Sequence, residues 1–261
     1  MDLTEPALLS ENRAGVTTLK FNRPKQLNAL NSPLLDALRS ELETISRSPD
    51  VRVVVLAGLG AAFSPGHDLK ELMANRNEAF VAGVFERCSA LMMAMAHMPQ
   101  PIVARVHGIA TAAGCQLVAG CDMAVAATDA RFATSGINFG LFCATPGVPL
   151  SRNISRKRAF EMLFTGEFID AQTALQWGLV NRVVPANRLD EEIAAVARSF
   201  LEKPAAVIAA GKKLFYEQLE SSMSSAYKMA SAAITQNMLG PEAAEGIGAF
   251  LEKRRPKWHG G

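Results

Sequence analysis

Two nearly continuous apolar segments, with helix-forming sequence between them, limit what this chain can fold into more than any other feature. They read VRVVVLAG at residues 51–58 and PIVARVHG at residues 101–108. Apolar runs without alternation are typical of strands that are covered by helices on both faces, as in parallel sheets. A further strand is indicated at residues 15–22, where GVTTLKFN is followed by an Arg-Pro pair. Strands that alternate with helices predict an α/β fold with a parallel sheet.

The first helix is expected shortly after the strand at residues 15–22. Ser32 is the predicted N-cap, and Pro33 is the predicted first helical residue. Apolar residues then recur at helical spacing, at Leu34, Leu35, Leu38, Leu42 and Ile45. This spacing predicts one buried face of the helix.

The pattern becomes purely helical towards the C-terminus. Before that change we expect a short strand at residues 131–133, a loop through residue 149, a helix at about 151–163 and a short helix capped by Asp170.

From about residue 187 the sequence is helical nearly to the end, with breaks at Pro204 and Pro241. A boundary near residue 200 therefore separates an α/β core, residues 1–200, from a helical C-terminal region, residues 201–261. The apolar faces of this region either fold back on their own core or pack against other subunits.

Composition excludes several classes of partner. The 27 basic and 25 acidic residues give a net charge of +2, which argues against binding to nucleic acid or to an anionic membrane. The apolar runs are too short to span a bilayer, and no presequence pattern is visible, so we expect a cytoplasmic protein. The four cysteines and four histidines lack metal-ligand spacing, so we expect no metal site and reduced, buried thiols.

Two glycine-bearing turns, each after a predicted strand, indicate a candidate ligand-binding site. AAFSPGHDLKEL follows the first long apolar run, and HGIATAAGCQLVAG follows the second. In the second turn, Gly108, Gly114 and the alanines between them leave room for a ligand oxygen to approach backbone amides at a helix N-terminus. An amide from the first turn, near Gly66 to Asp68, would complete an oxyanion hole. The same small residues also fit ordinary packing of a helix on a sheet.

The chain resembles the crotonase superfamily, the enoyl-CoA hydratase/isomerase group, from about residue 14 to residue 258. The resemblance is carried, in order, by LKFNRPKQLNALN, VRVVVLAGLGAAFSPGHDLKEL, PQPIVARVHGIATAAGCQLVAGCDMAVAATDARFATSGINFGL, AFEMLFTGEFIDAQTALQWGLVNRVVP and EGIGAFLEKRRPKW. FSPGHDLKEL, GIATAAGCQL and GLFCATPGV are similar to the enoyl-CoA hydratase domain-containing branch. The resemblance implies a crotonase-like spiral of ββα units with a C-terminal helical trimerisation region. It also implies homotrimers or hexamers and an acyl-CoA thioester as ligand, with no cofactor beyond the coenzyme A of the substrate.

The resemblance also implies roles for individual residues. The backbone N–H groups of His67 and Ala113 occupy the oxyanion positions. Further residues match segments that bind the rest of the substrate: Lys25, Gln26, Leu27, Pro65, Asp68, Leu69, Lys70, Phe250 and Lys253. The last two match tail residues that reach the ligand of a neighbouring subunit.

Two departures from the family pattern bear on chemistry. Gln116 and Gly136 stand where true hydratases have two glutamates that hold a water and move its proton. A glutamine is no general base at neutral pH, and glycine has no side chain, so efficient classical hydration is not expected. A bound anion or water in the space left by Gly136 is one substitute. The other polar candidates in sequence are His67, Asp68, Glu71, Asn138 and Cys143.

For His67 we expect the backbone amide to matter and the side chain to face away, and for Asp68 we expect a role in ordering its loop. The leading hypothesis is an enzyme of the hydratase/isomerase family, a lyase or isomerase, that acts on acyl-CoA or enoyl-CoA with atypical acid/base residues. The alternatives are a non-catalytic acyl-CoA binding protein and an acyl-CoA thioester hydrolase.

Overall fold

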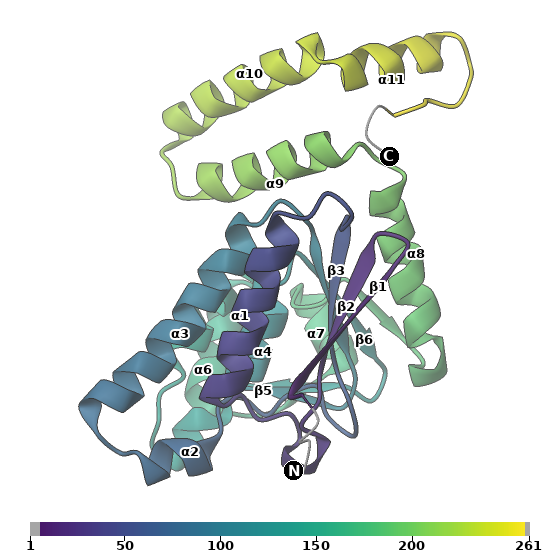
Figure 1. Cartoon of the computed structure of the whole chain (residues 1–261). Helices are drawn as coiled ribbons and strands as arrows, with labels where there is room; N and C mark the ends of the chain where they lie inside the picture. The colour runs from purple at the N-terminus through teal and green to yellow at the C-terminus, as the bar shows by residue number, and fades with distance from the viewer. Residues whose placement is uncertain (1–5, 259–261) are drawn as a thin grey trace.

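The computed structural model describes residues 6–258 and has the expected α/β architecture (Figure 1). The main sheet has the strand order β1-β2-β3-β4-β6-β9. Its strands are β1 (Leu8–Arg13), β2 (Val16–Phe21), β3 (Val53–Gly58), β4 (Ile102–Val106), β6 (Met123–Ala127) and β9 (Arg182–Val184). All neighbouring pairs are parallel except β1 with β2. The predicted parallel sheet is confirmed, whereas the edge strand β1 was not predicted.

Helices cover both faces of this sheet, which explains the continuous apolar runs. Helices α1 (Ser32–Ser46) and α3 (Glu78–His97) lie on one face, and α8 (Leu189–Leu201) lies on the other (Figure 1). Within β3, Val54 and Leu56 belong to the larger core with α1 and α3, whereas Val53 and Val55 belong to the core under α8. Successive side chains of a strand point to opposite faces, so every residue of β3 is buried.

The start of α1 differs from the prediction by one residue. Asn31 is the N-cap, and its side chain accepts a hydrogen bond from the Leu34 amide at 3.2 Å. Ser32 is the first helical residue, and its own amide donates to the Glu71 carboxylate at 3.0 Å. The predicted cap at Ser32 was therefore wrong. The predicted apolar face from Leu34 to Ile45 is buried as expected.

The segment after β7 (Arg131–Ala133) also differs from the prediction. The short strand is present, but a 3-10 turn (Ser135–Phe139) and two helices, α5 (Ala144–Asn153) and α6 (Arg156–Thr165), replace the expected loop and single helix. Pro149 lies inside α5, and the side chain of Asn153 donates to the Pro149 carbonyl at 2.8 Å. Proline and glycine favour a loop locally, but Pro146 and Leu150 become buried in α5, which packs on α4 (Ala113–Gly120).

A second, smaller sheet completes the core, with the order β5-β7-β8. It joins β5 (Ile109–Thr111) to β7 and β8 (Ile169–Asp170). The following helix α7 (Ala171–Trp177) is capped as predicted, because the Asp170 side chain accepts from the Thr173 amide at 2.7 Å.

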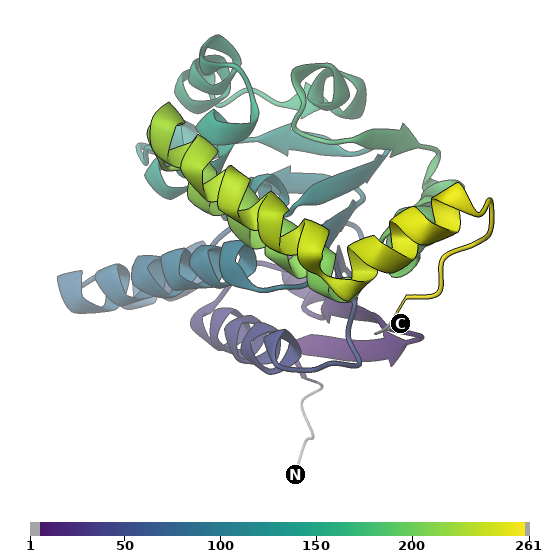
Figure 2. The ribbon, with the colours of Figure 1, turned by 90° about the horizontal axis from the view of Figure 1, so that it is seen from above.

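The C-terminal region is helical, as expected, and contains α9 (Ala205–Leu219), α10 (Met223–Leu239) and α11 (Pro241–Leu251). The breaks at Pro204 and Pro241 are confirmed, and a further break falls at residues 220–222. Helix α9 lies across the end of the sheet at which β3 and β4 begin, and α10 and α11 lie outside it (Figures 1 and 2).

The buried Lys212 fastens α9 to the core. Its ammonium group donates to Asp122 at 2.7 Å and to the carbonyls of Met95 and Gln100 at 2.9 Å each. Large apolar side chains of α10 and α11 remain exposed, namely Met223, Tyr227, Ile234, Met238, Leu239, Phe250 and Leu251. The α10 and α11 part of the tail thus has an apolar surface without a partner in residues 6–258.

Helix α3 is, by length and composition alone, apolar enough to cross a membrane, with a mean hydropathy of 1.4 over 18 residues. This differs from the expectation that every apolar run is too short. In the fold, Val84, Cys88, Leu91 and Met95 of α3 are buried in the core against α1 and α4. Helix α3 is therefore part of the folded α/β core.

Candidate active site

The two glycine-bearing turns lie side by side at the end of the sheet where β3 and β4 finish. Backbone hydrogen bonds join them: the Ser64 amide donates to the Ile109 carbonyl at 3.1 Å, and the Thr111 amide donates to the Ser64 carbonyl at 3.0 Å. The first turn also pairs with the segment before α1, because Leu30 forms an isolated bridge with His67. These bonds fix the position of the first turn on two sides.

Two glycines allow this close approach. A Cβ atom on Gly108 would lie 2.1 Å from the Ala61 carbonyl oxygen, and one on Gly114 would lie 2.1 Å from the Ser64 carbonyl oxygen. No side chain fits at either position. These two glycines allow close backbone packing between the two turns, and their effect on the site is to bring its two turns together.

The backbone amides of His67 and Ala113 are both left without an acceptor in residues 6–258. The bridge to Leu30 uses the Gly66 carbonyl and the Asp68 amide, so the N–H of His67 points away from Leu30. Gly66 lies directly against Ala113, since a Cβ atom on Gly66 would be 2.9 Å from the Ala113 nitrogen. The two unbonded amides are thus neighbours.

The residue before Ala113 has a strained backbone. Ala112 has φ 47° and ψ −120°, in the region that favours glycine, and its amide donates to the Ala133 carbonyl at 3.0 Å. Strain of this kind is stored where the surrounding structure holds it in place, often at functional sites. Here it coincides with the start of α4, where the positive end of the helix dipole adds to the Ala113 amide.

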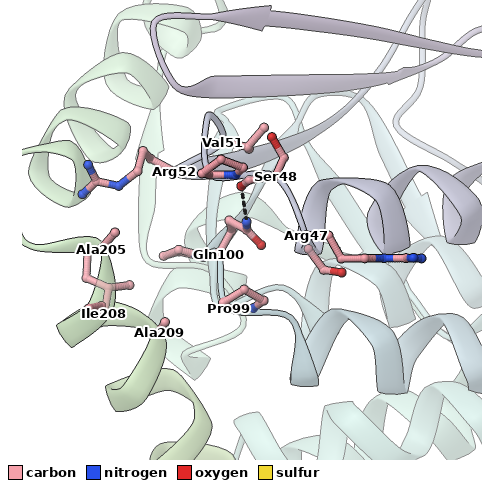
Figure 3. A pocket seen from close by; sticks show the side chains of 13 residues that line it. Arg47, Ser48, Val51, Arg52, Pro99, Gln100, Ala205, Ile208 and Ala209 are labelled. Carbon is pink, nitrogen blue, oxygen red and sulfur yellow. Dashed lines mark hydrogen bonds between the residues drawn. The ribbon is translucent and has the colours of Figure 1, made fainter. Parts of the chain in front are cut away.

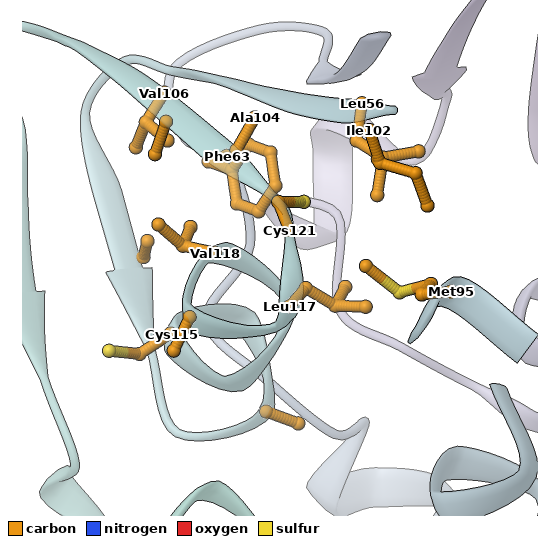
Figure 4. Packing of buried hydrophobic residues seen from close by; sticks show 14 of the residues in the cluster. Leu56, Phe63, Met95, Ile102, Ala104, Val106, Cys115, Leu117, Val118 and Cys121 are labelled. Atoms are coloured by element: carbon orange, nitrogen blue, oxygen red, sulfur yellow. The ribbon is translucent and has the colours of Figure 1, made fainter. Parts of the chain in front are cut away.

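The core holds α4 in place. Leu117, Val118 and Cys121 pack with Phe63, Ala104 and Val106 around the sheet, and Met95 of α3 lies beside Leu117 (Figure 4). All residues from Ala113 to Ala119 are buried. A helix packed this tightly gives the Ala113 amide a fixed direction.

Gln116, the first of the two positions at which the resemblance predicts a glutamate in true hydratases, is 3% exposed and lies one turn along α4 from Ala113. The Cys88 thiol of α3 donates to its Oε1 atom, with 3.8 Å between sulfur and oxygen. Its Nε2 atom has no acceptor within the described chain. Gln116 therefore presents an amide donor, and no base, to this region.

Gly136, the second position at which the resemblance predicts a glutamate in true hydratases, has no room for a Cβ atom. A Cβ atom on Gly136 would lie 2.6 Å from the Leu141 carbonyl oxygen and 2.8 Å from the Cys143 sulfur. The Leu141 amide also donates to the Gly136 carbonyl at 3.0 Å, so the 3-10 turn folds back on itself. The possibility of an anion or water in the place of a side chain at Gly136 gains no support, because Leu141 and Cys143 occupy the position of a Cβ atom.

The side chain of His67 is enclosed. Its ring meets Phe85 of α3 edge to face, with 5.1 Å between centroids, and neither ring nitrogen has a hydrogen-bond partner in residues 6–258. Burial lowers the pKa of this imidazole to about 4, opposed by a weaker contact with the Leu30 backbone. The ring is therefore neutral near pH 7.

The cysteines are buried thiols, as expected. Burial raises the pKa of Cys88 and of Cys115 to about 12, and it raises the pKa of Cys143 although a hydrogen bond to the Gly136 backbone opposes this. None of these thiols is activated as a nucleophile.

The acidic candidates are engaged in the local structure. Asp68 is the N-cap of α2 (Leu69–Ala74), accepts from the Lys70 amide at 3.1 Å and pairs with Arg23 at 3.0 Å. Burial alone would raise the pKa of Asp68, but the hydrogen bonds from Arg23 and from the Glu71 and Lys70 amides together lower it. Glu71 accepts from the Ser32 amide. Asp68 thus orders its loop, as predicted, and Arg23 is a contributor that sequence reasoning missed.

The Arg23–Asp68 pair joins the two segments expected to hold the nucleotide. Lys25, Gln26 and Leu27 are exposed in and after the 3-10 turn at Pro24–Gln26, while Leu69 and Lys70 are exposed in the first turn of α2.

The remaining predicted residues divide between the site and the tail. The Pro65 carbonyl accepts from the Thr111 hydroxyl at 2.9 Å, inside the site. Phe250 and Lys253 lie at and after the end of α11, at the opposite end of the sheet (Figure 1). The structure of one chain does not bring these two residues to the site. Asn138 donates to the Gly166 carbonyl at 3.3 Å.

A pocket of about 300 Å³ lies at this opposite end, where α1, the segment before β4 and α9 meet (Figure 3). The Gln100 amide nitrogen donates to the carbonyls of Ile45 and Ser48 there, and its oxygen is buried without a partner among residues 6–258. The guanidinium groups of Arg47 and Arg52 point away from the centre of the view (Figure 3). The pocket is separate from the two turns.

The class of this protein agrees with three features of the structure: the parallel sheet, the two joined turns, and the helix α4 that starts at an unbonded amide. The chain belongs to the Enoyl-CoA hydratase/isomerase family, which it matches over residues 11–261.

Particular relatives can also be named. The chain is 46% identical over 256 residues to enoyl-CoA hydratase domain-containing protein 3, mitochondrial, of Rattus norvegicus, covering 98% of this chain and 85% of that protein. The crystal structure of an enoyl-CoA hydratase from Mycobacterium smegmatis has 54% identity and a TM-score of 0.96, covering 98% of this chain and all of that one. The crystal structure of human enoyl-CoA hydratase domain-containing protein 3 has 44% identity and a TM-score of 0.94, covering 97% of this chain and 100% of that one.

Proposed function

We propose that this protein binds acyl-CoA thioesters and processes them as an enzyme, with the thioester oxygen accepting hydrogen bonds from the N–H groups of His67 and Ala113. The observation that carries the proposal is the pair of neighbouring backbone amides without an acceptor in the described chain. Negative charge develops on a thioester oxygen when an enolate forms. Each backbone donor in such a hole typically contributes about 3 kcal/mol to stabilising that charge.

The exposed lysines suit the phosphates of coenzyme A. Lys25 and Lys70 stand on the two segments that the Arg23–Asp68 pair joins. An ammonium group binds phosphate as a compact point charge.

We further propose a homotrimer or hexamer in which the exposed apolar face of α10 and α11 packs on another chain, so that Phe250 and Lys253 reach that chain's ligand. Coenzyme A as the sole cofactor group and a cytoplasmic location remain predictions from the sequence.

A second candidate function is acyl-CoA binding without turnover. It is favoured by the two replaced glutamates, since Gln116 presents a donor and Gly136 is packed against Leu141 and Cys143. General acid/base catalysis typically contributes a factor of about 10² to 10⁴ to a step, so its loss leaves little hydration. Thioester hydrolysis gains no support from the cysteines, because all four are buried and Cys143 is held protonated.

A pair of ligands tests the proposed hole directly. Butyryl-CoA and S-butyl-CoA differ in the thioester carbonyl and share the nucleotide and the chain length. By isothermal titration calorimetry, butyryl-CoA should bind about tenfold more tightly, since the two amides then gain an acceptor. Equal affinity would contradict the placement of the carbonyl.

Turnover separates the two candidates. Crotonyl-CoA and longer enoyl-CoAs should lose their conjugated thioester absorbance far more slowly than with ordinary family hydratases. Rates comparable to those enzymes would contradict the inference that the two glutamates are needed. Measurable conversion of any acyl-CoA would favour the enzyme over the binding protein.

A further inference from the structure

The side chain of Gln116 lies where the acyl part of a bound thioester would begin. On a helix, residues three apart share a face, and side chains lean towards the N-terminus. Gln116 follows Ala113 by three residues on α4, so its side chain leans towards the turn that carries the Ala113 amide. If the thioester oxygen rests on that amide, as the proposed function states, the first carbons of the acyl chain lie within reach of Gln116.

The Cys88 thiol fixes which end of the Gln116 amide faces this region. A thiol donates a weak hydrogen bond to oxygen, and Cys88 does so to Oε1 across 3.8 Å. Burial raises the pKa of Cys88 to about 12, so the thiol keeps the proton that it donates. The oxygen of the amide is thus directed to α3, and the NH₂ group is directed elsewhere.

The NH₂ group of Gln116 has no acceptor in residues 6–258, but its nitrogen is not completely buried. The buried side-chain atoms without partners in the described chain belong to Ser32, His67 and Gln100, so Nε2 of Gln116 borders space that solvent reaches. Gln116 is 97% buried, and a donor in such a residue lowers the stability of the folded protein unless a ligand or a water accepts a hydrogen bond from it. A saturated or enoyl hydrocarbon chain offers no acceptor, whereas a chain with a carbonyl oxygen does.

We propose that Gln116 is a specificity residue whose Nε2 group donates to an oxygen on the acyl chain near C3, so that the protein selects 3-oxoacyl-CoA thioesters over hydrocarbon acyl-CoA thioesters. The inference rests on the proposed function, because the thioester carbonyl sets the distance from Ala113 to C3.

Two four-carbon ligands test this inference. Acetoacetyl-CoA carries the C3 oxygen and butyryl-CoA lacks it, while the thioester and the nucleotide are the same. Calorimetry on the full-length protein should show acetoacetyl-CoA binding about fivefold more tightly, the ratio typical of one buried hydrogen bond.

Two variants assign the preference to the residue. Gln116→Met keeps the length and volume of the side chain and removes the donor, so it should bring the ratio to about one. Gln116→Glu replaces the donor by an ionised acceptor and should invert the ratio, because the carboxylate repels the C3 oxygen. If the Met variant fails to fold, the inverted ratio of the Glu variant carries the test.

The outcomes separate this inference from the proposed function. A ratio near one in the unaltered protein, or an unchanged ratio in Gln116→Met, overturns the role of Gln116, whereas tight binding of butyryl-CoA in the same experiment leaves the thioester site standing. Binding of both esters no tighter than free coenzyme A overturns both proposals.

Discussion

Replacing Gly136 by alanine tests whether the chain leaves room for a side chain at this position. The new Cβ atom would lie 2.6 Å from the Leu141 carbonyl oxygen and 2.8 Å from the Cys143 sulfur. The backbone at Gly136 does not have a positive φ, so steric overlap is the only penalty. Overpacking of this kind costs about 1–3 kcal/mol, and about 2 kcal/mol lowers the melting temperature of a chain this size by about 4 °C.

Differential scanning calorimetry provides the measurement, and Gly211→Ala provides the control. Gly211 lies in α9 with no heavy atom within 4 Å of its added Cβ, so that variant should gain up to about 1 kcal/mol from helix propensity. For the same steric reason, the double variant Gln116→Glu with Gly136→Glu should not acquire efficient hydration of crotonyl-CoA. Unchanged melting of Gly136→Ala, or strong hydration by the double variant, would refute the reasoning.

Further predictions concern charge and titration. Lys70→Ala should weaken binding of CoA esters more than binding of the matching pantetheine esters in calorimetry, and equal losses would exclude a phosphate role for this exposed lysine. Lys212→Met removes the ammonium group from the half-buried Asp122, which keeps the hydrogen bonds from the Tyr216 hydroxyl and the Ile102 amide, and should cost about 3 kcal/mol in urea unfolding. Exposed Lys213→Met should change stability by less than about 0.5 kcal/mol. The pKa of His67 is about 4 in the folded chain and 6.5 for the unperturbed group, so protonation favours the unfolded state. Stability should therefore fall as the pH drops from about 6.5 to about 4, by about 3 kcal/mol, and His67→Gln should remove that part of the slope.

The sequence indicates the sheet well because burial on both faces leaves a local signature. Within the strands β3 and β4 themselves, Arg105 is the one polar residue, and it is half-buried. The prediction failed where tertiary packing overrides local preference. Pro146 and Pro149 favour a loop, but burial of α5 against α4 holds a helix there.

The candidate site also has parts that the sequence predicts and parts that it does not. The two turns and their amides can be found from strand ends, glycines and a motif, because those features are local. The volume beside Gly136 could not be predicted, since it depends on how residues 141–143 fold back over the 3-10 turn. The pairing of Arg23 with Asp68 likewise joins residues 45 positions apart.

The Cys143 thiol, which lies next to Gly136, provides a native chemical probe for opening of the segment 136–143. A thiol that is buried and protonated reacts with an alkylating reagent only in molecules whose segment 136–143 has moved away. The rate of alkylation at this position therefore measures how often the segment opens, and any ligand that lodges against it would slow the labelling.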